Sequence, residues 1–550
     1  MKFPIVNKKG NRQLRLSALV LLAISIGLAS CKKYLDVVPD NVATLDNVFK
    51  LRSEAEKFLF TCYSYMPRNG DGWFNPGLTS ADEIWYPQST QTHWHPIFRL
   101  ALGQQNVDAP LFDEWAGARK SPDGRHDYLR IWSGIRNCNI MIENLRNNAK
   151  VPDLTSTERM RWTGEATFLK AYYHYYMLRM YGPIPIMDQS VNIDQIQTGE
   201  LKRRPVDECV NYISGLLDTA SKMLPSKITD ENNEMGRATV PMTLALKAKL
   251  WAMAASPLFN GNPDFAALRN REGEALFSAV PDPKKWEKAR DAAKAAIESA
   301  EALGARLYTY TNDVYNLSEQ TKVQLNVRNA ITQKWNAEVI WGNTQPDGGY
   351  FVNQSLCMPP VERNTNKDHF TFQGVWAPPL KMAKLFYTAN GVPIDEDKTL
   401  DFNNYEQLRT AEAGEKYYIE TGFTTARLNF DREPRFYADL GFDGGIWYMK
   451  DGNAAGSDIN TYYVKAKNTE AAGFGHVANW SETGYFVKKL VNWESSTHGS
   501  AISWKAYPWP EVRLADLYLL YAEALNEVTP ASPTAIEYLD KVRTRAGLKG

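Results

Sequence analysis

Several residue types and motifs are scarce in this chain, and each scarcity excludes a class of function. Only five cysteines occur among 550 residues, and they lie too far apart to form a Cys-x-x-Cys pair. Zinc ribbons and thioredoxin-like redox centres therefore have no support in the sequence. The chain also contains no Gly-x-Ser-x-Gly elbow and no His-Glu-x-x-His motif. It thus lacks the usual signatures of serine hydrolases and zinc proteases.

Neither sign of charge is in excess, since 63 basic side chains stand against 63 acidic ones. The first 30 residues hold five of the basic residues and no acidic one, so the remaining chain carries 58 against 63, a net charge of −5. A mildly acidic chain has no electrostatic basis for binding nucleic acid. Long apolar runs are missing as well. No stretch after residue 30 approaches the roughly 20 apolar residues that span a membrane as a helix.

The N-terminus is typical of a bacterial lipoprotein signal peptide. A basic head precedes an apolar run of about 13 residues, Leu16 to Leu28, which leads into Ala29-Ser30-Cys31. A basic head, a short apolar run and small residues before the cleavage point describe a secretory signal. A cysteine directly after Leu-Ala-Ser resembles the lipobox, in which a diacylglycerol is attached to the thiol before cleavage. We therefore expect residues 1–30 to be removed and Cys31 to anchor the chain through lipid, because two or more acyl chains hold a protein stably on a membrane. An ordinary signal peptide with a chance cysteine is the alternative.

A helical period of apolar residues recurs along much of the chain. The segments that show it are 53–66, 128–146, 165–181, 206–220, 242–256, 286–300, 511–527 and 534–546. Gly182 and Pro183 should end the third of these helices, since glycine suits a helix cap and proline cannot continue the helix. Pairs of helices joined by short turns, with large and small apolar residues alternating, are typical of tetratricopeptide-type hairpins.

The character of the sequence changes between about 303 and 505. Gly, Pro, Asn and aromatic residues dominate there, with short extended pieces at 338–341 and 485–487 and a helical stretch only around 377–389. A second loop-rich insertion covers about 67–120. We expect a mainly α fold in which a helical scaffold, about 40–300 and 505–550, carries an irregular half with small sheet elements. Residues 31–550 should form one domain.

Several motifs spread along the chain resemble those of the SusD/RagB family, outer-membrane lipoproteins that capture nutrients in Bacteroidetes-type bacteria. The matching stretches are Cys31-Lys32-Lys33-Tyr34-Leu35-Asp36 with Pro39, Tyr181-Gly182-Pro183-Ile184-Pro185, Arg237-Ala238-Thr239, Ala254-Ala255-Ser256-Pro257-Leu258-Phe259-Asn260, Ala389-Asn390-Gly391 with Pro393-Ile394, Arg432-Glu433-Pro434-Arg435-Phe436, Arg513-Leu514-Ala515-Asp516, Tyr521-Ala522-Glu523-Ala524 and Val542-Arg543-Thr544-Arg545-Ala546-Gly547-Leu548. They follow the order that the family shows.

The resemblance implies a fold, a function and a partner. It implies a SusD-like protein, lipid-anchored at the surface of the outer membrane, that binds oligosaccharide without catalysis. It would act as a lid on a SusC-like TonB-dependent transporter, with no cofactor. Relatives usually continue beyond the Arg-Ala-Gly-Leu stretch, so the resemblance also implies a C-terminus truncated at Gly550. Lys32-Lys33 stands where surface-exported relatives often carry acidic residues, so the resemblance does not decide between the outer and the inner leaflet of the membrane.

Candidate ligand contacts concentrate in the 67–120 insertion. Sugar binding needs flat apolar faces for C–H surfaces and polar groups for hydroxyls, and aromatic side chains supply large contact areas at low entropic cost. No helical stripe explains the tryptophans of this segment as core. The predicted ligand-binding residues are Trp73, Asp82, Trp85, Tyr86, Trp94 and, in a second loop where relatives place ligand contacts, Tyr350. For any single aromatic residue among them, packing in the core is the competing interpretation.

Two other sites can be considered in the same insertion. His93-x-His95 could hold a metal through two imidazoles, but two loop histidines beside Trp94 are the simpler interpretation. Asp82 and Glu83 are neighbours, whereas a glycosidase needs two carboxylates that face each other across the scissile bond. We therefore predict no metal site and no enzyme. The alternative functions are an oligopeptide-binding uptake lipoprotein and a surface glycoside hydrolase.

Overall fold

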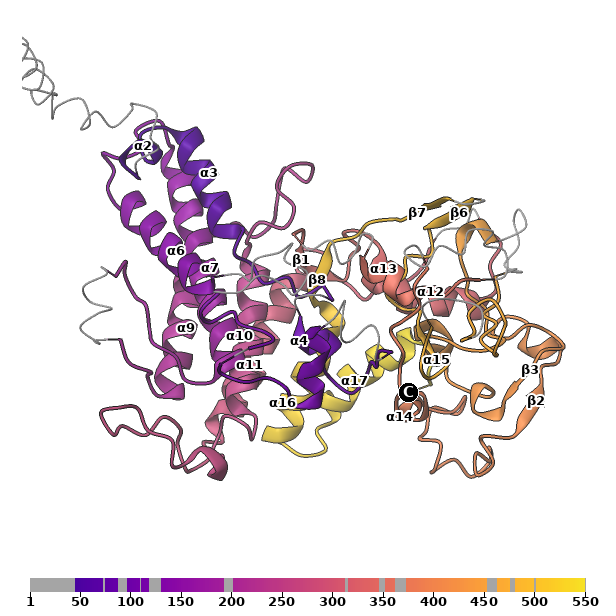
Figure 1. Ribbon diagram of the computed structural model, residues 1–550. Coiled ribbons are helices and arrows are strands. Elements are labelled where there is room, and N and C mark those ends of the chain that lie inside the picture. Colours follow the sequence, from indigo (N-terminus) through magenta and orange to yellow (C-terminus); the bar gives the residue numbers. More distant parts are fainter. Residues whose placement is uncertain are drawn as a thin grey trace, which may run out of the picture.

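The structure is a computed structural model that describes residues 45–72, 75–87, 96–108, 110–117, 130–191, 201–311, 315–345, 352–361, 372–452, 462–474, 480–498 and 501–549. A helical half and an irregular half lie side by side, and the last two helices lie between them (Figure 1). The predicted mainly α architecture, with tetratricopeptide-type hairpins and a loop-rich half, is confirmed.

The helical half consists of antiparallel neighbours in chain order. Its helices are α3 (Arg52–Tyr63), α6 (Ile131–Leu145), α7 (Ser156–Tyr181), α9 (Val206–Ser221), α10 (Val240–Ala255) and α11 (Lys284–Glu301), with the short α2 (Leu45–Val48) before them. Each helix from α6 onward packs on the next, and α11 then packs on α16 (Leu514–Val528), which pairs with α17 (Pro533–Arg545). About 200 residues therefore separate α11 from α16 in the sequence, although the two helices pack together.

The helix α7 begins earlier than its apolar stripe predicts. The side chain of Thr155 accepts a hydrogen bond from the Glu158 backbone N–H at 3.2 Å, and the Glu158 carboxylate accepts one from the Thr155 N–H at 3.1 Å. This reciprocal capping box satisfies two N–H groups at the start of the helix. Gly182 ends the helix with φ +69°, a conformation that glycine adopts without strain, so the predicted C-terminus is confirmed.

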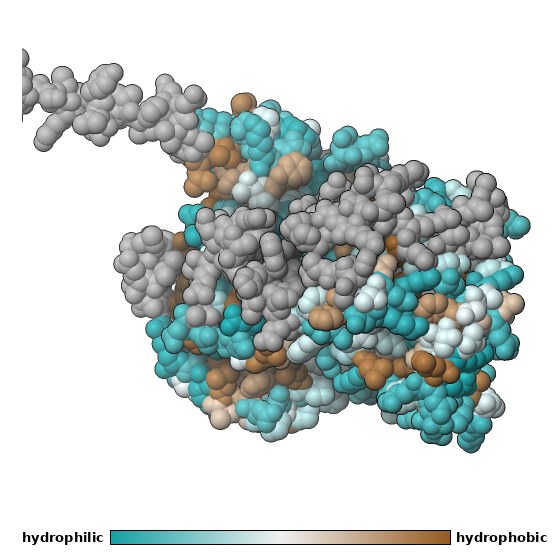
Figure 2. Space-filling view, turned by 45° about the vertical axis from the view of Figure 1, so that its right-hand side comes forward, coloured by the Kyte–Doolittle hydropathy of each residue, from teal (hydrophilic) through white to brown (hydrophobic). Residues whose placement is uncertain are grey.

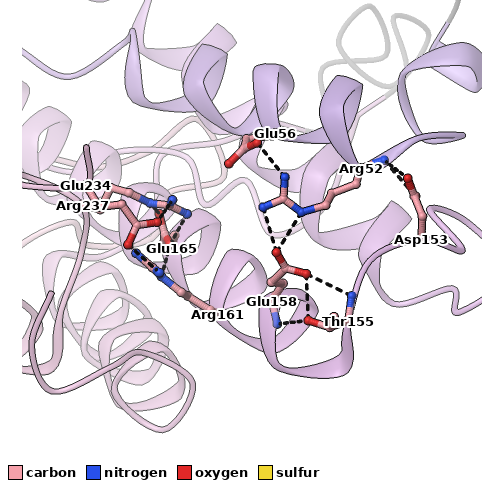
Figure 3. Close-up of polar contacts among 9 residues, drawn as sticks. All are labelled: Arg52, Glu56, Asp153, Thr155, Glu158, Arg161, Glu165, Glu234 and Arg237. Atoms are coloured by element: carbon pink, nitrogen blue, oxygen red, sulfur yellow. Dashed lines mark hydrogen bonds and ion pairs between the residues drawn. The ribbon is translucent and has the colours of Figure 1, made fainter. Parts of the chain in front are cut away.

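Buried ion pairs join these helices to one another (Figure 3). Glu165 of α7 is fully buried and accepts hydrogen bonds from Arg237 at 2.7 and 3.0 Å and from Arg161 at 3.0 Å. The Tyr63 hydroxyl of α3 donates to the same carboxylate at 2.7 Å. One acidic side chain thus connects α3, α7 and the segment that leads into α10.

The irregular half contains short helices and strand pairs. The helices are α12 (Glu319–Thr332), α13 (Val352–Cys357), α14 (Leu380–Leu385) and α15 (Pro434–Asp439). The strands form antiparallel pairs: β1 (Val339–Asn343) with β8 (Trp509–Arg513), β2 (Leu408–Thr410) with β3 (Thr424–Ala426), β4 (Leu440–Gly441) with β5 (Phe486–Val487), and β6 (Ser496–His498) with β7 (Ala501–Ser503). Short 3-10 helices fall at Pro96–Leu102, Pro263–Phe265, Ala413–Glu415, Arg427–Asn429 and Lys450–Gly452. No helix among these described ranges is long and apolar enough to cross a membrane.

The apolar residues form separate cores in the two halves. The first core gathers the inner faces of α3 to α11 with Trp341 and residues of α16. The second core surrounds Trp376 and Trp447, and it also contains Ile84, Tyr86 and Phe98. Ile84, Tyr86 and Phe98 of the 67–120 insertion therefore pack on the irregular half, although the expected scaffold range of about 40–300 includes them. On the face seen in Figure 2 the described surface is mostly hydrophilic, with small separate apolar patches.

Candidate functional site

The segment from Asp82 to Tyr86 connects the short helix α4 (Pro76–Thr79) to the second core. Its backbone is fixed by a two-way bridge: the Trp85 N–H donates to the Ala377 carbonyl at 2.8 Å, and the Ala377 N–H donates back at 3.0 Å. Successive side chains of an extended backbone point to opposite sides. This bridge therefore decides which residues of the segment face the solvent.

Trp85 remains a candidate platform for a ligand. The residue is 37% exposed, and its ring makes an edge-to-face contact with Phe98, with the ring centroids 4.9 Å apart. Because the contact uses the edge of one ring, it leaves part of the indole surface open. This arrangement suits stacking against an apolar ligand face.

Tyr86 is a core residue, so its prediction as a ligand contact is wrong. The side chain has no exposed surface and packs on Phe98, with centroids 4.7 Å apart, and on Trp376 at 6.5 Å. Its position follows from the alternation along the extended segment: with Trp85 directed outward, its neighbour must point inward.

Asp82 lies on the surface next to α14. Its side chain is 77% exposed and accepts a hydrogen bond from the Lys381 ammonium at 3.0 Å. That hydrogen bond lowers the pKa of Asp82, so the carboxylate is ionised at neutral pH. An exposed, ionised carboxylate can accept hydrogen bonds from ligand hydroxyls.

The other predicted residues lie outside the described ranges. They are Cys31, Trp73, Trp94 and Tyr350, together with the two histidines weighed as metal ligands, His93 and His95. Over the part of the chain that is described, no three His, Cys, Asp or Glu side chains gather as a metal site would require. Cys62, Cys138, Cys209 and Cys357 are free and buried.

Two hollows lie next to the Asp82–Tyr86 segment, one on each side of α14. The first, which we name the α14 groove, has a volume of about 890 Å³ and is lined by Lys381, Leu385 and the loop from 394 to 405. The second, which we name the central cavity, has a volume of about 510 Å³. Met382 and Phe386 line the central cavity, so the two sides of one short helix face different hollows.

The central cavity is built from segments that are far apart in the sequence. Leu78, Glu83 and Ile84 contribute one part of its lining, Asp439 and Leu440 a second part, and Trp509 to Glu511 with Arg513 a third. Lys249 of α10 and Asp516 of α16 also line it, and their side chains form an ion pair at 2.9 Å. The cavity thus lies where the helical half meets the irregular half, and its lining mixes aromatic, aliphatic and charged groups.

Sequence reasoning missed Trp509 and Asp439 as site residues. Trp509 stands in the strand β8, and its ring fits closely over Gly70: a Cβ atom at position 70 would lie 2.5 Å from the ring. The glycine is therefore needed for this placement. No local motif marks either residue, because the cavity exists only once distant segments have come together.

Comparisons with known proteins agree with this architecture. The SusD/RagB model, described as the SusD family, matches residues 337–550, and a model described as starch-binding associating with outer membrane matches residues 103–252. The search of curated proteins found no match.

Solved structures resemble the chain over nearly its whole length. BT4246 is 27% identical with a TM-score of 0.75, and the match covers 91% of this chain and 83% of that one. A SusD-like protein (BF3747) from Bacteroides fragilis is 20% identical with a TM-score of 0.60, covering 92% and 80%. A SusD-like carbohydrate binding protein (BF0978) from the same species is 14% identical with a TM-score of 0.53, covering 91% and 79%. From the two matched segments and the shared fold, we conclude that this chain belongs to the SusD/RagB family.

Proposed function

We propose that this protein is a non-catalytic lipoprotein of the outer membrane surface that binds oligosaccharide for uptake. The observation that carries the proposal is the pairing of a partly exposed indole, Trp85, with an exposed carboxylate, Asp82, on one short segment beside two hollows. Sugars present C–H faces and hydroxyls together, and this combination of side chains can contact both. The matched family description, starch-binding associating with outer membrane, supports the same function.

The proposal includes a partner and an anchor. The lipid on Cys31 would tether the protein to the membrane, and a SusC-like TonB-dependent transporter would receive the bound sugar. A lid of this kind needs a binding surface and a flexible attachment, but no bond-breaking chemistry. Trp73, Trp94 and Tyr350 are proposed as further ligand contacts on the same reasoning from their residue types.

The sugar assignment can be tested with glycan and peptide arrays probed by the chain from residue 32 onward. We expect retention on glycans and none on peptides. Retention on peptides alone would replace the sugar assignment with the oligopeptide alternative. Release of shortened glycans from the array would identify the protein as a surface hydrolase.

The partner can be tested by affinity purification from membranes solubilised in mild detergent. We expect a β-barrel transporter of larger mass to be recovered with the lipoprotein. A Cys31→Ala variant, which lacks the membrane tether and is purified from the soluble fraction, is mixed with the same detergent extract to control for contacts formed after solubilisation. Recovery of the lipoprotein alone at low salt would contradict the partnership.

A further inference from the structure

The central cavity contains a buried hydrogen-bond acceptor that nothing in the described structure satisfies. Asp439 ends α15, lines the cavity and is only 8% exposed. Its Oδ1 atom has no hydrogen-bond partner among the described residues, and its Oδ2 atom lies 3.7 Å from the Lys489 ammonium. A buried acceptor without a donor is destabilising. Because Oδ1 is itself enclosed, the acceptor that the cavity offers to a donor on a bound molecule is Oδ2, which lies beyond hydrogen-bonding distance of Lys489.

The surroundings of Asp439 favour an uncharged donor over a cation. The buried guanidinium groups of Arg328 and Arg545 both interact electrostatically with the Asp439 carboxylate. Lys489 adds a third positive charge at the cavity wall. These positive groups offset the charge of the Asp439 carboxylate, but none of them donates a hydrogen bond to its oxygens. An ammonium bound at Asp439 would lie near three positive charges, since the cavity's other acidic residues, Glu83, Glu511 and Asp516, line different parts of it, whereas a hydroxyl carries no charge.

Aromatic side chains line the same cavity. Trp509 packs over Gly70 and still borders the cavity, and Phe386 borders it from the end of α14. Aromatic rings bind the C–H surface of a sugar ring, and a buried acceptor binds one of its hydroxyls. The volume of about 510 Å³ is within the range of about 300–1,000 Å³ that small-molecule sites occupy.

We propose that the central cavity is a second saccharide subsite, which takes an uncharged sugar unit with a hydroxyl donating to Asp439 and a ring face on Trp509. This inference rests on the proposed sugar-binding function and extends it from the exposed Trp85 surface to an enclosed pocket. Glu83 and Ile84 line the cavity while Trp85 is exposed nearby on the same segment. A single oligosaccharide could therefore contact both places.

Short sugars test the subsite, because they can occupy the cavity without reaching the Trp85 surface. The full chain, purified from membranes in detergent, is titrated with maltose, cellobiose and the cationic dimer of glucosamine. We expect saturable binding of at least one neutral disaccharide and at least tenfold weaker binding of the glucosamine dimer. Asp439→Asn should weaken the neutral disaccharide about tenfold.

Two variants of α14 locate the binding. Met382→Trp fills the central cavity and should abolish disaccharide binding, whereas Leu385→Trp, on the side of the helix that faces the α14 groove, should leave it within twofold. Thermal unfolding confirms that each variant is folded. If Met382→Trp does not fold, Leu78→Trp is used instead, because Leu78 of α4 also lines the cavity.

The outcomes separate this inference from the proposed function. No disaccharide binding, unchanged binding in Met382→Trp, or a preference for the glucosamine dimer would overturn the subsite. If long oligosaccharides still bind in those cases and lose affinity in Trp85→Ala, the proposed function stands without the subsite. If no glycan of any length binds, both fail.

Discussion

Replacing Trp85 with alanine separates a binding role from a packing role. Trp85 is 37% exposed, so nearly two thirds of its surface is buried, part of it against Phe98. Truncating a fully buried tryptophan costs about 3–5 kcal/mol. Scaled by burial, Trp85→Ala should lower the free energy of unfolding by about 2–3 kcal/mol. Trp376 is fully buried, so Trp376→Ala should lower it by about 3–5 kcal/mol. Denaturant titration followed by circular dichroism measures both values.

The effect of Trp85→Ala on binding should be larger than any loss of folded protein explains. A central aromatic contact contributes about 2 kcal/mol or more to binding, so we expect the Kd for oligosaccharide to rise about 30-fold, measured well below the unfolding transition. Phe265→Ala is the matched control, because Phe265 is also 37% exposed and packs on a single ring, Phe277. Unlike Trp85, whose neighbours Glu83 and Ile84 line the central cavity, Phe265 has no neighbour in the chain that lines either hollow. An affinity within twofold of the unchanged protein, or an equal loss in the control, would refute Trp85 as a platform.

Three further predictions concern the anchor and the helical scaffold. Cys31→Ala should abolish lipid attachment and release the protein from membranes; mass spectrometry of the N-terminal peptide should show a diacylated cysteine in the unchanged protein, and a free thiol there would contradict the anchor. Glu165→Ala should cost about 3 kcal/mol in denaturant titration, because it removes the buried carboxylate that accepts from Arg237, Arg161 and Tyr63 and leaves Arg237 paired only with Glu234. Glu56→Ala, which breaks a partly exposed pair, should cost less than about 1 kcal/mol. Burial lowers the pKa of His174 to about 4, below the roughly 6.5 of an unfolded chain, so its stabilising contribution is present above pH 6.5 and is lost as the pH falls toward 4. That loss, about 3 kcal/mol, should disappear in His174→Asn.

Much of the helical half could be predicted from the sequence because its helices bury apolar stripes. The segment 206–220, for example, is helical from Val206 to Ser221, and Val210, Ile213 and Leu217 are buried as the period requires. The helix α12 was missed for the opposite reason. It buries Gln324, Arg328 and other polar residues, and the Arg328 guanidinium donates to two backbone carbonyls of the irregular half. A buried polar face produces no hydrophobic period.

The candidate site could be predicted only in part, and the reasons are geometric. The aromatic content of the insertion pointed to Trp85, which is exposed, but composition cannot distinguish it from the buried Tyr86. The bridge to Ala377, 292 residues away in the sequence, sets that difference. The central cavity lay beyond sequence reasoning because Leu78, Asp439 and Trp509 meet only in the folded chain.

The most direct test of non-catalytic sugar binding is equilibrium dialysis of the chain from residue 32 onward against the oligosaccharide that it retains best on the array, followed by chromatography of that oligosaccharide. We predict saturable binding, with all of the sugar recovered at its original length. Dialysis that shows no saturation would contradict sugar binding, and recovery of shortened products would contradict its non-catalytic character.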